Sequence, residues 1–186
     1  MKWKKLNAAL GLLSIVLLLA HVGYSVYAYL AMYYNPLLKQ LTAYPFMVTA
    51  SLHAVLGMII VFTHADGSSL HLYPRQNLRT VLQRVSASLI LPLLILHINT
   101  FGLLNQTSAA GQWFFFALLI LGEILFFAVV ITHVAVSLTP GLITLGRLSS
   151  PSARKRLDRA LFLLGAAAFA FSVYAVLRGQ LAMFVH

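Results

Sequence analysis

Four histidines lie within separate long apolar segments and are the residues best suited to do chemistry: His21, His53, His97 and His133. Ionisable side chains are costly inside a bilayer, and they usually mark a functional site there. Imidazole is a good ligand for iron, and the chain has no cysteine to supply a thiolate. One histidine in each of four segments therefore predicts two pairs of axial ligands for two haem b groups.

The depth of each histidine along its segment sorts the four into pairs. A helix rises about 1.5 Å per residue, so position along an apolar segment gives depth in the membrane. By this measure His21 and His97 lie in the outer half and are predicted to ligate an outer haem, whereas His53 and His133 are predicted to ligate an inner one. The alternative for any one of them is a hydrogen bond to a neighbouring helix.

The composition is that of a membrane protein, with 61% hydrophobic and 9% charged residues and a mean hydropathy of +0.90. Soluble domains have about a quarter of their residues charged. Five apolar stretches are long enough to cross a bilayer, which takes about 20 residues. They cover residues 7–32, 44–64, 79–104, 112–139 and 157–184. We therefore expect an all-α integral membrane bundle, one transmembrane domain over 1–186, with a four-helix core that holds the haems.

Lysine and arginine predict the orientation of this bundle, because they are enriched in cytoplasmic loops. Only Lys39 and Arg178 of the 13 basic residues fall on the side opposite the N-terminus. The N-terminus is therefore expected inside and the C-terminus outside, and the positive charge reflects topology and not nucleic-acid binding. An alternative for the first segment is a signal peptide cleaved after Ala28, which would remove His21.

The sequence around these histidines resembles the five-helix dihaem cytochrome b membrane anchor of succinate dehydrogenases and fumarate reductases. Residues 52–58 (LHAVLGM) are similar to that family's FHALYGL ligand helix, and 77–87 (NLRTVLQRVSA) to its NWxYxLQRxTG motif. The segments 18–21 (LLAH), 140–146 (PGLITLG) and 150–156 (SPSARKR) resemble further family motifs in the same order.

The resemblance implies a function, partners and a location. The chain would pass electrons between membrane quinone, with menaquinone expected, and an iron–sulfur subunit that docks on the inner face and carries a flavoprotein. It would form the quinone-reacting part of a succinate:quinone oxidoreductase in a bacterial cytoplasmic (inner) membrane, where the whole complex could dimerise. Arg75, Arg79 and Arg84 face the inner side, where haem propionates and a partner should lie, and Arg84 is the expected propionate contact. The alternative for each arginine is simple anchoring of the inner side by positive charge.

Glu123 is the only carboxylate in the interior of an apolar segment. We expect it to handle protons at a quinone site near the outer haem. Its alternative role is a neutral glutamic acid hydrogen-bonded between helices. Weaker candidates for holding the quinone head group are Tyr24, Tyr27, Asn99 and Gln106. We expect His64, His71 and His186 to be solvated residues at or beyond the membrane surface.

The chain also departs from the family pattern. Ser86-Ala87 replaces threonine-glycine, Ala20 replaces the glutamate that commonly precedes the first ligand, and Ile131 stands where some members have an acidic residue for proton movement. Two other functions stay open: a dihaem quinol-reacting anchor of nitrate-reductase type, in which two helices would carry the ligands, and a haem-free membrane anchor or transporter.

Overall fold

The computed structural model describes residues 2–63 and 74–184 and folds them into five helices. They are α1 (Lys2–Ala31), α2 (Pro36–Thr63), α3 (Pro74–Ala109), α4 (Trp113–Thr144) and α5 (Pro151–Phe184). All five are long and apolar enough to cross a membrane, so the prediction of an all-helical, five-span chain is confirmed for the described residues. His64, His71, His186 and the side chain of Arg75 lie outside the described part.

The helices extend beyond the apolar stretches that predicted them. Three prolines that lie outside the predicted segments occupy the first position of α2, α3 and α5: Pro36, Pro74 and Pro151. Proline suits that position because its missing N–H has no partner there and its fixed φ is already helical. Asn35 caps α2, since its Oδ1 accepts two backbone N–H groups of the first turn. The helix α3 continues past the predicted end of its segment at residue 104 and ends at Ala109, just before Gly111, whose φ is +67°.

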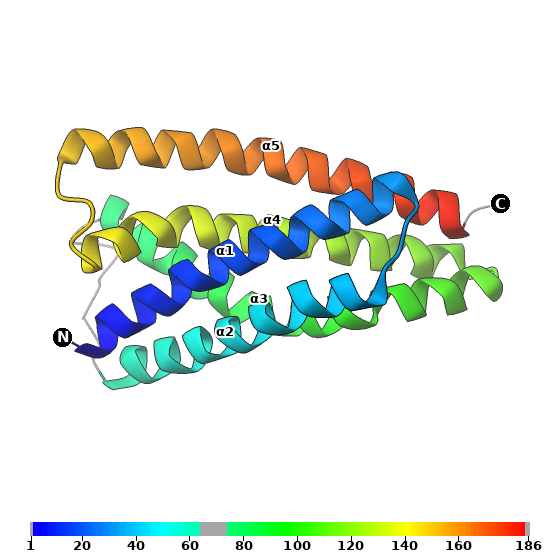
Figure 1. The fold of residues 1–186 in the computed structure, drawn as a ribbon, viewed down its shortest axis with the longest axis horizontal. Helices are drawn as coiled ribbons and strands as arrows, with labels where there is room; N and C mark the ends of the chain where they lie inside the picture. The colour runs from blue at the N-terminus through cyan, green and yellow to red at the C-terminus, as the bar shows by residue number, and fades with distance from the viewer. Residues whose placement is uncertain (1, 64–73, 185–186) are drawn as a thin grey trace.

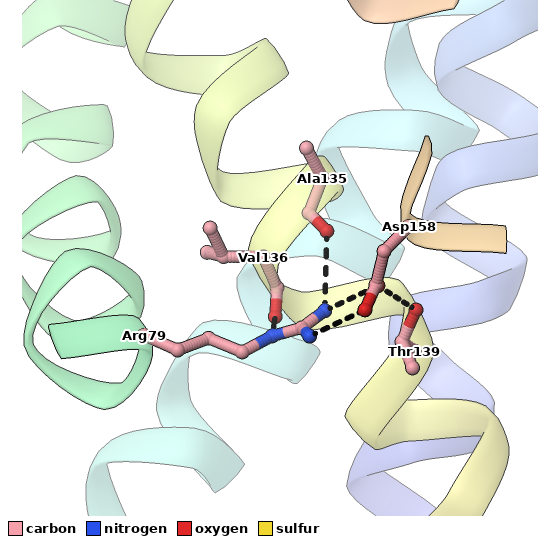
Figure 2. A network of polar contacts seen from close by, with 5 residues as sticks. All are labelled: Arg79, Ala135, Val136, Thr139 and Asp158. Atoms are coloured by element: carbon pink, nitrogen blue, oxygen red, sulfur yellow. Dashed lines mark hydrogen bonds and ion pairs between the residues drawn. The ribbon is translucent and has the colours of Figure 1, made fainter. Parts of the chain in front are cut away.

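The helix α4 continues past its predicted end at residue 139, through Pro140 to Thr144. Proline has no N–H, so Pro140 leaves the carbonyl of Val136 without its helical hydrogen bond. Arg79 of α3 takes that place, because its Nε donates to the Val136 carbonyl at 2.8 Å (Figure 2). A donor from a neighbouring helix therefore compensates for a proline in the last turns of α4.

The same arginine joins three helices. Its guanidinium forms a two-pronged ion pair with Asp158 of α5, with N···O distances of 3.1 and 3.0 Å (Figure 2). Thr139 of α4 donates to the same carboxylate at 2.6 Å. We call Arg79, Thr139 and Asp158 the arginine clamp. Arg79, which we expected to face haem propionates or a partner, thus pairs with a carboxylate of its own chain.

The helices run along the long axis of a bundle, and α5 lies along one edge of it (Figure 1). The closest packing is between α1 and α2 and between α3 and α4, while α5 contacts mainly α4 and α1, the latter near its C-terminal end. A small core of Leu104, Phe116 and Ile120 lies near the end where the C-terminus is found. Large apolar side chains such as Phe62 and Phe162 face outwards, as expected for lipid contact.

Candidate functional site

Within the α1–α2 pair, each helix supplies a histidine and an oxygen that binds the histidine of the other. His53 of α2 contacts the backbone carbonyl of Asn7 in α1, with Nδ1 and the oxygen 3.0 Å apart. His21 of α1 contacts the hydroxyl of Thr42 in α2 through its own Nδ1, at 3.5 Å. The two contacts lie 14 residues apart along α1 and 11 residues apart along α2, or roughly 21 and 17 Å at about 1.5 Å per residue.

The α3–α4 pair repeats this exchange. His133 of α4 contacts the Ser86 hydroxyl of α3, with Nδ1 and Oγ 3.1 Å apart. His97 of α3 contacts Glu123 of α4, with Nδ1 and Oε2 2.8 Å apart. Here about ten residues, roughly 15 Å of helix, separate the two contacts along each helix. Every one of the four helices therefore carries one histidine and one oxygen partner, at two different depths.

The partners determine which ring nitrogen carries the proton. A backbone carbonyl and a carboxylate can only accept, so His53 and His97 donate from Nδ1. Ser86 already donates its own proton to the Leu82 carbonyl at 2.6 Å, and Thr42 donates to a carbonyl of its own helix, so both hydroxyls accept. For all four imidazoles these partners favour the tautomer with N–H at Nδ1 and a lone pair at Nε2. That arrangement is typical of metal-ligating histidines, whose second nitrogen donates to an oxygen.

The structure brings the histidines together in two levels across the two helix pairs. The ring centroids of His53 and His133 are 6.4 Å apart, with an interplanar angle of 64°. A metal bound to both Nε2 atoms, at roughly 2 Å each, would hold the centroids about 6 Å apart. The contacts of His21 and His97 lie further along the helices, at a second level. We call these the His53–His133 level and the His21–His97 level.

Close packing fixes three of the rings. A Cβ added at Gly11 of α1 would meet the His53 ring at 3.0 Å, so glycine there makes room for the imidazole. His97 stacks on Phe126, with ring centroids 4.8 Å apart and planes 25° apart. His21 lies parallel to Phe46 at 6.2 Å. Rings held in this way lose little further freedom when they bind a ligand.

Glu123 is buried, with 3% of the residue exposed, and Gln180 of α5 is 1% exposed. Next to Gln180, Gly179 packs against the ring of Tyr29 in α1. Within residues 2–63 and 74–184, the second carboxyl oxygen of Glu123, Oε1, has no hydrogen-bond partner, and neither has Oε1 of Gln180. The carboxyl group of Glu123 thus links α4 to α3 through His97, and α5 packs closely on α1 at Gly179.

The other residues predicted for a quinone site are dispersed. Tyr24 closes the α1–α2 loop, because its hydroxyl donates to the Asn35 carbonyl at 2.8 Å and accepts from the Asn35 N–H at 2.7 Å. Tyr27 packs edge-on against Tyr33. Asn99 donates to a carbonyl of its own helix, and Gln106 is exposed. Arg84, the expected propionate contact, is exposed on α3.

Sequence reasoning missed the partners contributed by α1 and α2. Asn7 acts through its backbone carbonyl, which no side-chain pattern reveals, and Gly11 acts through the absence of a side chain. Thr42 precedes the predicted start of its segment at residue 44. The one available signal was spacing, because Thr42 and Ser86 each lie eleven residues before a histidine of the same helix.

No family model, curated protein or solved structure matches this chain. The resemblance described from its motifs therefore remains a hypothesis, and the functional argument depends on the arrangement of the histidines.

Proposed function

We propose that the chain is a dihaem cytochrome b membrane anchor that passes electrons between membrane quinone and the iron–sulfur subunit of a succinate dehydrogenase or fumarate reductase complex. The observation that carries this proposal is the reciprocal arrangement of four histidines, each bound through Nδ1 to an oxygen of the neighbouring helix. Four imidazoles with free Nε2 atoms, two at each of two levels, form two pairs of axial ligands.

The residues fit the cofactor in number and in position. Two imidazoles leave a metal in need of further ligands, which a porphyrin supplies in its own plane. The two histidines of each level come from different helix pairs, and those pairs pack less closely with each other than their own helices do. A flat group between the pairs is consistent with this packing. When bound, haem iron would carry one electron by changing between its ferric and ferrous forms.

The chain's own contribution is to hold the ligands and to keep water away. Asn7, Thr42, Ser86 and Glu123 orient the four rings. The apolar helices bury the site within the bilayer, and burial and hydrogen bonding are among the properties that set a haem's reduction potential. Succinate and fumarate would react on the flavoprotein, not here.

The quinone and the protein partners are further parts of the proposal. The resemblance favours a quinone site near the His21–His97 level, where Glu123 is the buried acidic group. It also favours a soluble iron–sulfur partner at the inner face. The basic N-terminal parts of α3 and α5 would contribute to this docking surface. If Glu123 transfers protons to quinone, Glu123→Gln should reduce quinol-linked turnover while both haems stay bound.

Haem quantification tests the central claim. Purified chain should contain two low-spin haems, measured as the pyridine haemochrome against protein concentration. His53→Ala and His97→Ala should remove different spectral species, because the two histidines belong to different levels. Ser88→Ala is a matched control: Ser88 is exposed on α3 and bonds only its own helix, so this variant should keep both haems. Fewer than about one haem per chain in the unmodified protein would refute the proposal.

A second experiment distinguishes between the respiratory complexes. Native purification from cells that make the whole set of neighbouring gene products should recover an iron–sulfur protein and a flavoprotein together with the chain. Recovery of a molybdenum-containing nitrate reductase would favour the other dihaem anchor. A variant that loses both haems but binds the same partners would favour a structural anchor.

A further inference from the structure

The four histidine partners are not equivalent. At the His53–His133 level both partners are neutral, a backbone carbonyl and a serine hydroxyl. At the His21–His97 level, Thr42 is also neutral, but His97 has the carboxyl group of Glu123 at 2.8 Å. That contact is also the shortest of the four. The two levels therefore differ in one charged group, placed directly behind one ring.

The position of Glu123 makes this contact rigid. The Glu123 side chain is 4% exposed and contacts His97 of the neighbouring helix α3. The His97 ring also stacks on Phe126, so the ring is held both through Nδ1 and across its face. A buried carboxylate is expensive unless it has a strong partner. In the described part of the chain His97 is the only hydrogen-bond partner found for this carboxyl group, and Oε1 has none.

We infer that Glu123 is a positioning residue that holds His97 with the ring proton at Nδ1. It also makes Nε2 of His97 a stronger electron-pair donor to a metal than Nε2 of the other three histidines. This inference rests on the proposed function, because the effect would be expressed on a metal at Nε2. A carboxylate behind an imidazole increases the basicity of the ligand. A more basic ligand stabilises ferric over ferrous iron, so the haem at the His21–His97 level is held at a lower reduction potential than it would have with a neutral partner.

Two variants separate the charge from the orientation. Glu123→Gln keeps an oxygen that accepts from His97 but removes the charge. We expect both haems to remain bound, while the equilibrium constant for reduction of the haem at the His21–His97 level rises about tenfold, which is about 59 mV for one electron. Glu123→Leu also removes the acceptor, and we expect it to lower haem occupancy at that level. The measurements are redox titration and low-spin EPR of the purified protein.

Thr100→Val is the matched control. Thr100 is 2% exposed, lies three residues after His97 on α3, and donates only to a carbonyl of its own helix. It should leave both potentials unchanged. The haem at the His53–His133 level serves as an internal control in Glu123→Gln. Equal potentials in Glu123→Gln, Thr100→Val and the unmodified protein would overturn the inference.

A measurement on the haem-free protein tests the positioning without the cofactor. Nitrogen-15 NMR of labelled histidine in detergent should find His97 protonated at Nδ1, and in Glu123→Leu this single tautomer should be lost. If the unmodified chain binds no haem, the proposed function fails, and the tautomer of His97 still decides whether Glu123 positions the ring. If haem binds and the tautomer does not depend on Glu123, only this inference fails.

Discussion

Each intramembrane histidine depends on a small residue or an oxygen atom contributed by the adjacent helix. The clearest case is His53, whose ring has the Asn7 carbonyl at 3.0 Å and the backbone of Gly11 on the same helix face. Neither contact is made by a side chain, so no sequence pattern reveals it. At the scale of single residues, the site therefore consists of ligands that are easy to identify and supports that are not.

Gly11 offers a test at this scale. Gly11→Ala would place a methyl group 3.0 Å from the His53 ring, so the ring should move and haem occupancy at the His53–His133 level should fall. Residues that support metal ligands typically affect metal affinity by about 10- to 100-fold, so we expect the haem affinity to fall by a factor in that range. Haem titration of the purified variant, followed spectroscopically, measures it.

Gly23→Ala on the same helix is the control, because a Cβ there meets no atom within 4 Å. It should bind haem as the unmodified protein does. If Gly11→Ala retained both haems with unchanged affinity, the close packing of α1 on His53 would have no functional weight.

At the scale of helices, the exchange of histidines and oxygens makes α1–α2 and α3–α4 two similar units. The arginine clamp then joins the second unit to α5, and it does so at the point where Pro140 interrupts α4. A proline within a helix normally costs about 3 kcal/mol or more, partly through a lost hydrogen bond. Here Arg79 supplies a replacement donor, so the proline and the arginine should be energetically coupled.

A double-mutant cycle measures this coupling. Arg79→Met should lower the free energy of unfolding by about 1–3 kcal/mol, because it removes hydrogen bonds from a charged group and leaves the Val136 carbonyl unpaired. Pro140→Ala restores an N–H for that carbonyl, so Arg79→Met should cost less in the Pro140→Ala background. We expect a coupling of about 0.5–1.5 kcal/mol from denaturation in mixed micelles.

Thr139→Val provides the comparison, since it removes one hydrogen bond to Asp158 but leaves Val136 and its donor intact. It should show little coupling to Pro140→Ala. Additive effects of Arg79→Met and Pro140→Ala would contradict the replacement of the helical bond by Arg79.

At the scale of the whole molecule, the two ends of the bundle differ in charge. The N-terminus and the loop between α4 and α5 lie at one end, and the α1–α2 loop and the C-terminal end of α5 lie at the other (Figure 1). The first end carries the lysines of the N-terminus and the basic start of α5, while Lys39 and Arg178 lie towards the second. Cytoplasmic loops are enriched in lysine and arginine, so the first end is expected inside.

Reporter fusions test this orientation. Alkaline phosphatase, which is active only outside the cytoplasm, should be active when joined after residue 111 and inactive when joined after residue 148. A fluorescent protein that folds only inside should show the opposite pattern at the same two positions. Phosphatase activity at residue 148 and none at residue 111 would show the opposite orientation and place the His21–His97 level on the inner side.

The sequence by itself determined the number of helices, their membrane character and the four histidines, because apolar length and an ionisable residue within it are local properties. It also predicted which histidines share a level, since depth depends only on the rise of a helix. The predicted helices were too short. A proline can be the first residue of a helix, and α4 continues past Pro140, where Arg79 donates a hydrogen bond to the Val136 carbonyl. The partners of the rings came only from the tertiary structure. The Asn7 carbonyl, the space at Gly11 and the contact between His97 and Glu123 exist only when two helices pack at one rotation and one register, and those follow from the whole bundle.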